Sequence, residues 1–159
     1  MVKLHIGCWK KIKEGYENID LYHGPIYMDM FDLKYADGSV KHILSHHTLE
    51  HAGHGLKGHR GVPQALAEWF RVLKPGGSIE VVVPDTEKCV RDWLKSTNLD
   101  DYSNMQIWGH QAEAGHYHFC GFKKSTVGQY FRKAGFTAIK VAAFKPRKTP
   151  SIIITAKKP

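Results

Sequence analysis

The sequence predicts an α/β domain with a mostly parallel sheet and an antiparallel pair of strands at its C-terminal edge. Apolar segments with strand patterns alternate with amphipathic helical segments, which is typical of parallel strands covered by helices. The last two strand patterns, 136–144 and 151–156, are joined by a short basic turn at 145–148, which favours antiparallel pairing. The length of 159 residues suits a single domain over residues 1–159.

The first half of the chain contains most of the predicted strands. Strand patterns separated by turn residues occur at residues 2–7, 16–21, 26–28 and 40–45. A helix is predicted over 62–73, because apolar residues recur at helical spacing and Pro63 stands in the first turn. A Lys-Pro-Gly-Gly sequence at 74–77 ends this helix, and the apolar run 79–83 is typical of a strand buried on both faces.

Two further helices are predicted in the second half of the chain. Asp85 can cap a helix over 86–95, and Ser125 can cap a helix that ends at Gly135. Between these helices, residues 96–120 show no sustained period, and a connection of this length is uncommon in a compact domain. We therefore expect residues 96–120 to form a lid or a binding insertion.

The amino-acid composition argues against a disulfide-rich, a thiolate zinc-binding or a membrane-spanning protein. The three cysteines, Cys8, Cys89 and Cys120, are widely spaced, so neither a disulfide framework nor a thiolate zinc site is indicated. No apolar run approaches the roughly 20 residues that a membrane span needs, and residues 1–7 lack the features of a signal peptide, so a cytoplasmic protein is expected. The net charge of +8 favours anionic partners, nucleic acid among them.

Several sequence motifs occur together in a characteristic order. They are Leu4-His5-Ile6-Gly7-Cys8, Asn18-Ile19-Asp20, Ser45-His46-His47-Thr48-Leu49-Glu50-His51 and Glu68-Trp69-Phe70-Arg71-Val72-Leu73-Lys74-Pro75-Gly76-Gly77. The C-terminal half adds His116, His118, Gly121-Phe122 and Ala134-Gly135-Phe136. In this order and spacing the chain resembles a small class I S-adenosylmethionine-dependent methyltransferase of the type 11 branch, and the resemblance covers nearly all of its length.

The resemblance implies a Rossmann-like methyltransferase sandwich and an enzyme that uses S-adenosylmethionine and releases S-adenosylhomocysteine. Only eight positions separate Gly7 from Gly15, which is too few for a crossover helix. The first crossover helix is therefore expected to be reduced or missing. Small members of the branch have no separate substrate domain, so methyl transfer to a small-molecule or glycan acceptor is expected, with residues 96–120 as the acceptor-binding insertion.

The resemblance also implies a set of cofactor-binding residues at the carboxyl ends of the strands, where α/β sheets bind ligands. In chain order they are Gly7, Cys8, Trp9, Asp20, Leu21, Asp29, Met30, Ser45 and His46. Gly7 lacks a Cβ, which lets the backbone approach a ligand closely. Asp20 can accept hydrogen bonds from a ribose diol, and Trp9 stands where the family usually has a second glycine.

Histidines are the candidate acid–base groups, since an imidazole titrates near neutral pH. His46 or His118 is predicted to be the general base. Residues predicted to bind the acceptor are His47, His110, His116 and Tyr117. No metal site is predicted.

Three alternatives compete with this interpretation. The positive charge, together with aromatic residues that could stack on bases, allows a nucleic-acid methyltransferase. Trp9 and the missing helix allow a non-catalytic S-adenosylmethionine-binding protein. Residues 47–51 also match H-x-x-E-H, the pattern of a zinc hydrolase, although that pattern needs a regular helix and Gly53 and Gly55 follow at once.

Overall fold

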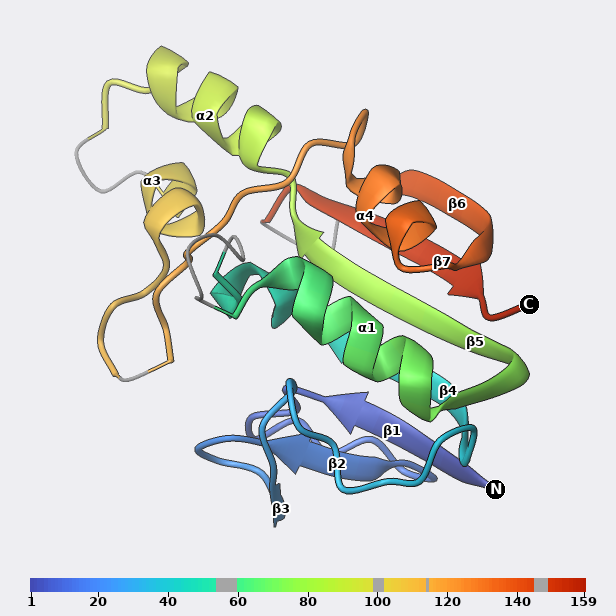
Figure 1. Ribbon diagram of the computed structural model, residues 1–159. Coiled ribbons are helices and arrows are strands. Elements are labelled where there is room, and N and C mark those ends of the chain that lie inside the picture. The colour runs from blue at the N-terminus through green and yellow to red at the C-terminus, as the bar shows by residue number, and fades with distance from the viewer. Residues whose placement is uncertain (54–59, 99–101, 114, 145–148) are drawn as a thin grey trace.

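The computed structural model describes residues 1–53, 60–98, 102–113, 115–144 and 149–159. Within these residues, seven strands form one sheet in the order β3-β2-β1-β4-β5-β7-β6 (Figure 1). The strands are β1 (Val2–Ile6), β2 (Glu17–Asp20), β3 (Ile26–Tyr27), β4 (Val40–His46), β5 (Leu73–Pro84), β6 (Thr137–Phe144) and β7 (Ser151–Lys157). The first five strands pair in parallel, whereas β7 is antiparallel to β5 and β6. The predicted fold class is confirmed.

The helices of the described residues connect or flank these strands. They are the 3-10 helix η1 (Leu49–His51) and the α-helices α1 (Val62–Val72), α2 (Thr86–Lys95), α3 (Tyr102–Trp108) and α4 (Val127–Lys133). Helix α1 has Pro63 in its first turn, and helix α2 begins after Asp85, whose carboxylate accepts a hydrogen bond from the Lys88 backbone N–H at 3.2 Å. None of the described helices is long and apolar enough to cross a membrane.

The core lies between one face of the sheet and helices α1 and α4, which lie on the same side of the sheet in Figure 1. Trp69 of α1 and Phe131 of α4 are fully buried there. The strand residues on this face are mostly aliphatic: Leu4, Ile6, Ile43, Ile79, Val81, Val83, Ile152 and Ile154. Removing this apolar area from water is the main driving force for folding.

The opposite face of the sheet carries polar side chains. By strand register, His5, His42 and Glu80 lie on it together with Leu44. Residues 7–16, which join β1 to β2, contain no helix, so the predicted loss of the first crossover helix is confirmed. Polar residues on this face are compatible with the lack of a covering helix beside β1 and β4, whereas β5 and β7 are apolar on both faces at Val82 and Ile153.

The structure differs from the sequence-based expectation at three elements. Strand β5 begins at Leu73 rather than near residue 79, because the Lys-Pro-Gly-Gly segment already pairs with its neighbours. Helix α3 lies inside the stretch predicted to lack regular structure, and none of its residues is fully buried, so no apolar period marks it. Helix α4 has Thr126, not Ser125, at its N-cap position. The predicted basic turn at 145–148 lies outside the described residues.

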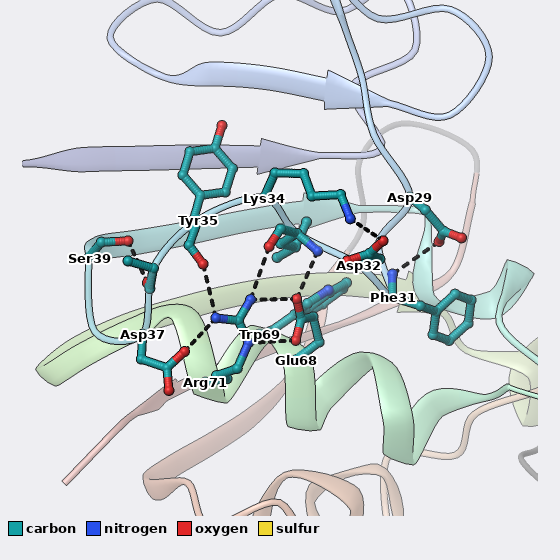
Figure 2. A network of polar contacts seen from close by, with 12 residues as sticks. Asp29, Phe31, Asp32, Lys34, Tyr35, Asp37, Ser39, Glu68, Trp69 and Arg71 are labelled. Atoms are coloured by element: carbon teal, nitrogen blue, oxygen red, sulfur yellow. Dashed lines mark hydrogen bonds and ion pairs between the residues drawn. The ribbon is translucent and has the colours of Figure 1, made fainter.

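Arg71 of α1 ties the segment between β3 and β4 to the helix (Figure 2). Its guanidinium donates to both carboxylate oxygens of Glu68, at 2.7 and 2.8 Å, and to the carbonyls of Leu33 and Tyr35, at 3.0 and 2.9 Å. The Glu68 carboxylate also accepts the Leu33 backbone N–H at 2.7 Å. Such bidentate, charge-assisted contacts are the strong ones. The Glu-Trp-x-Arg sequence therefore has a structural role.

We expect Glu68→Gln to lower the free energy of unfolding by about 2 kcal/mol at neutral pH, since it removes charge-assisted hydrogen bonds. The Arg71 guanidinium lowers the pKa of the Glu68 carboxyl below its ordinary value of 4.5. The destabilisation caused by Glu68→Gln should therefore have its full size above pH 4.5. It should become smaller as the pH falls through the lowered pKa of Glu68. Denaturant unfolding of the wild type and the variant at several pH values measures this difference in the free energy of unfolding.

The matched control is Glu87→Gln, which removes an exposed pair with Arg91 one helical turn away. Such surface pairs contribute less than about 1 kcal/mol. Equal destabilisation by the two variants would contradict a structural role for Glu68.

Candidate functional site

Gly7, at the carboxyl end of β1, lies directly against Thr48. Gly7 has a φ of +69°, and a Cβ at this position would lie 2.0 Å from the Thr48 Oγ1. Both the backbone conformation and the lack of space therefore require glycine. The sequence predicted a ligand close to this glycine, but its close neighbour in the structure is Thr48. Contact between Gly7 and a cofactor stays a prediction.

Asp20, the last residue of β2, joins the loops that follow β1 and β2. Its Oδ2 accepts the backbone N–H of Trp9 at 2.8 Å. Its Oδ1 accepts the backbone N–H groups of Tyr22 and His23, at 2.9 and 3.0 Å. A carboxylate has about four acceptor positions, so one remains for a hydroxyl group of a ligand. Asp20 therefore organises this edge of the sheet and can still bind a ligand.

Trp9 adopts a left-handed conformation with a φ of +45°, which costs a tryptophan more than a glycine. Its side chain is 40% exposed, and its ring makes edge contacts with the rings of His23 and His116, with centroids 6.2 and 6.3 Å apart. The adjacent Cys8 is buried, and burial raises the pKa of its thiol, as does the charge of Asp20. The indole ring therefore lies beside the loop after β1, and the turn is formed by backbone atoms.

Three of the remaining predicted cofactor-binding residues follow β2 and β3. Leu21 is exposed. Asp29 accepts the Phe31 backbone N–H at 3.0 Å and pairs with Arg60 at 2.8 Å. The carbonyl of Met30 accepts the indole N–H of Trp69 at 2.9 Å, which fixes this segment on α1. The carboxylate of Asp29 keeps acceptor positions for a ligand amino group.

Three predicted residues lie at the end of β4, and their side chains have different surroundings. Ser45 faces the core and is fully buried, and its hydroxyl has no hydrogen-bond partner among the described residues. His46 points to the opposite face, where its Nε2 lies 3.0 Å from Oε1 of Glu80 on β5. His47 has a φ of +55°, and its Nδ1 lies 3.2 Å from Oε1 of Glu50. Both histidines have a carboxylate neighbour, and the contact between His46 and Glu80 is the aligned hydrogen bond that suits a general base.

Residues 109–113 and 115–118, which include three of the four predicted acceptor-binding residues, contact the loops after β1 and β2. Glu113 forms an ion pair with His23 at 3.1 Å. Gly115 lies so close to Tyr22 that an added Cβ would be 2.5 Å from its ring. These contacts are those expected of an insertion that covers the edge of the sheet, and its role as a lid stays a prediction.

Within this segment, His116 contacts a predicted cofactor-binding residue. Its ring contacts the rings of Trp9 and His110, with both centroid distances 6.3 Å. Tyr117 stacks on Phe119 instead. The structure therefore brings His116 to Trp9 and His110 to His116, while Tyr117 lies with a second aromatic ring.

His118, the other candidate base, belongs to a cluster with Glu50 and His51 that the sequence analysis did not predict. One potential metal-binding atom from each residue lies within 4.8 Å of the other two. Burial raises the pKa of the Glu50 carboxyl, but His47, His51 and His118 together lower it below the ordinary value. Burial lowers the pKa of the His118 imidazole. The cluster forms because the Phe119 backbone N–H donates to the Glu50 carbonyl at 2.9 Å.

The H-x-x-E-H sequence at 47–51 does not form the helix that the zinc-hydrolase pattern needs. Leu49–His51 is a single 3-10 turn, and Ala52 is already extended. His47 lies before this turn in a left-handed conformation, so His47 and His51 are not one α-helical turn apart. The structure does not support that alternative in its usual geometry.

Comparison with protein families shows that residues 9–81 match the family described as "Methyltransferase domain". Among curated proteins, a demethylmenaquinone methyltransferase from Listeria monocytogenes serotype 4a is 23% identical over 145 residues, which are 86% of this chain and 56% of that protein. The chain thus spans about half the length of the curated relatives it matches.

Solved methyltransferase structures share the fold. An S-adenosylmethionine-dependent methyltransferase from Methanosarcina mazei has a TM-score of 0.63 and 18% identity, over 98% of this chain and 91% of that one. A second similar structure is the 1,6-didemethyltoxoflavin-N1-methyltransferase of Burkholderia thailandensis with bound 1,6-didemethyltoxoflavin and S-adenosylhomocysteine. It has a TM-score of 0.67 and 16% identity, and the match covers 99% of this chain and 70% of that one. The shared fold and the match of residues 9–81 support the resemblance to class I S-adenosylmethionine-dependent methyltransferases. The Burkholderia structure holds S-adenosylhomocysteine, which is the product of the cofactor that the resemblance implies.

The residues at this edge fit S-adenosylmethionine. Asp20 stands at the end of β2 with an acceptor position left for a ribose hydroxyl, and Asp29 keeps positions for an amino group. The loops that would surround the cofactor are already ordered by contacts within the chain.

We expect Gly7→Ala to lower the free energy of unfolding by about 3 kcal/mol, because left-handed strain adds to overpacking against Thr48. Gly15→Ala is the matched control: its φ is +76°, but nothing lies within 4 Å of an added Cβ. It should cost only about 1 to 2 kcal/mol. Denaturant unfolding compares the two variants. Equal losses in the free energy of unfolding would show that packing against Thr48 is unimportant.

Proposed function

We propose that the chain transfers a methyl group from S-adenosylmethionine to a small-molecule or glycan acceptor. The observation that carries the proposal is Asp20, which links the loops after β1 and β2 through three N–H groups at the ligand-binding edge of the sheet. Gly7, Cys8, Trp9, Leu21, Asp29, Met30, Ser45 and His46 are the other residues assigned to the cofactor site.

Methyl transfer needs little covalent help from the protein. Bound S-adenosylmethionine supplies an electrophilic methyl group on a sulfonium, and the protein contributes by holding the acceptor in line with that group. An oxygen acceptor also benefits from loss of its proton. His46 is assigned this role because Glu80 can orient its ring and stabilise the imidazolium that forms.

Residues 109–118 are assigned to the acceptor. Trp9, His110 and His116 form a run of ring contacts over the loops of the predicted cofactor site, and flat ring surfaces suit a planar acceptor. The names of the relatives support a small molecule: one is a demethylmenaquinone methyltransferase, and one structure contains bound 1,6-didemethyltoxoflavin.

Cofactor binding is tested by calorimetric titration with S-adenosylmethionine and S-adenosylhomocysteine. The expected result is micromolar binding that weakens about 10-fold or more in Asp20→Ala, because a charge-assisted hydrogen bond is lost. Circular dichroism must accompany the titration, since Asp20 also orders two loops.

Asp37→Ala is the control for this titration. It removes an exposed carboxylate that pairs with Arg71, between β3 and β4, and should leave cofactor affinity unchanged. Absence of wild-type binding at millimolar ligand would contradict the proposal. Binding without methyl transfer to any acceptor would favour a non-catalytic cofactor-binding protein.

We expect His46→Asn to lower kcat for an oxygen acceptor by about 100-fold or more while KM changes little. Glu80→Gln should lower kcat less and shift the pH profile, because the carboxylate acts through the imidazole. Formation of S-adenosylhomocysteine measures both effects. An unchanged kcat in His46→Asn would remove His46 as the base.

A further inference from the structure

A buried carboxylate and two imidazoles meet beside η1. Glu50, whose side chain is 1% exposed, contributes a carboxylate with no hydrogen-bond partner for either oxygen within the described part of the chain. Although His47 Nδ1 lies 3.2 Å from Oε1, this contact is not aligned as a hydrogen bond. A buried carboxylate with unfilled hydrogen-bond positions is costly unless positive charge lies beside it, so the position of Glu50 calls for a cation.

Backbone carbonyl groups fix the ring orientations of the two imidazoles in the cluster. Nδ1 of His51 lies 2.8 Å from the carbonyl oxygen of Tyr117, and Nδ1 of His118 lies 2.9 Å from that of Gln106. Because a carbonyl only accepts, each Nδ1 must donate its hydrogen. Each neutral ring therefore keeps an unprotonated Nε2. Histidines that bind metals are oriented by just this kind of contact to a backbone carbonyl.

We propose that Glu50, His51 and His118 bind one divalent transition-metal ion of the zinc type. Two imidazole nitrogens and one carboxylate are a donor set that such ions take up, and a site with three protein ligands keeps a position for water or another oxygen. Ligand atoms around tetrahedral zinc are about 3.3 to 3.6 Å apart. The observed limit of 4.8 Å therefore requires only small side-chain movements.

This site differs from the H-x-x-E-H pattern of zinc hydrolases. Glu50 is a ligand here rather than the base that activates water, and His118 replaces His47 as the second histidine. The thiol of Cys120 lies close by, but burial and the charge of Glu50 raise its pKa to about 12. With a metal bound to it, His118 is a ligand and His46 remains the candidate base.

A bound ion would join two distant parts of the chain. Glu50 and His51 follow β4, whereas His118 follows the segment that contacts Trp9 and His23. Backbone hydrogen bonds from Phe119 and Cys120 to the Glu50 carbonyl, at 2.9 and 3.3 Å, already align the two parts. The ion should therefore raise the thermal stability of the native protein.

The test is calorimetric titration of the chelator-treated full chain with Zn²⁺, together with visible absorption spectra after Co²⁺ addition. We expect one ion per chain with micromolar or tighter affinity, a Co²⁺ spectrum of low coordination number and a higher melting temperature with Zn²⁺. Glu50→Gln and His118→Asn should each weaken Zn²⁺ binding by about 100-fold or more, since even changes behind the ligands cost 10- to 100-fold.

His42→Asn is the matched control, because His42 bonds to Ser78 within the sheet and lies outside the cluster. It should bind Zn²⁺ like the wild type. Circular dichroism and the melting temperatures of the metal-free variants show whether Glu50→Gln and His118→Asn are folded. A folded variant that binds no Zn²⁺ has lost the site and not the fold.

The proposal is overturned if the wild type shows no saturable Zn²⁺ binding, or if Glu50→Gln and His118→Asn bind as tightly as His42→Asn. The first result would mean that protonated histidines balance the charge of Glu50. The second would mean adventitious binding by other histidines. Neither result depends on methyl transfer, so failure here and failure of the proposed function are distinguishable.

Discussion

The edge of the sheet that holds the candidate site depends on one carboxylate. Asp20 accepts the N–H groups of Trp9, Tyr22 and His23, so a single side chain sets the paths of the loops after β1 and β2. In a fold with a full crossover helix, the helix itself would orient the loop after β1. Here residues 7–16 contain no helix, and charge-assisted hydrogen bonds to Asp20 take over this task.

The missing helix has consequences across the sheet. One face packs on α1 and α4 and is apolar, whereas the other carries His5, His42 and Glu80. Residues 109–118 contact Trp9 and His23 from the far end of the chain and so contribute to the edge that the short loop leaves open. The candidate site is thus built from local loops and one distant segment.

Sequence patterns were sufficient for the elements that local rules determine. The helix over Val62–Val72 follows from apolar spacing and Pro63, and the buried strand after it follows from its apolar run. Helix α3 escaped prediction because it buries no residue completely.

The candidate site was predictable only in part, for a physical reason. Asp20 could be placed at the end of a strand from the sequence, but its three backbone partners depend on loop conformation. Gly7 was singled out for a contact with a ligand, whereas its neighbour in the structure is Thr48. The burial of Glu50 depends on the docking of residues 117–120, a contact between segments that no local pattern encodes.

If the loops ordered by Asp20 form the cofactor site, a bound cofactor product changes the chemical environment of their backbone amides. The measurement is the set of amide resonances of the ¹⁵N-labelled protein during titration with S-adenosylhomocysteine. We expect the largest shifts at Gly7, Trp9, Tyr22 and His23, with little change at α4. Saturable shifts confined to other parts of the chain, or no shifts at millimolar ligand, would contradict this assignment of the cofactor site.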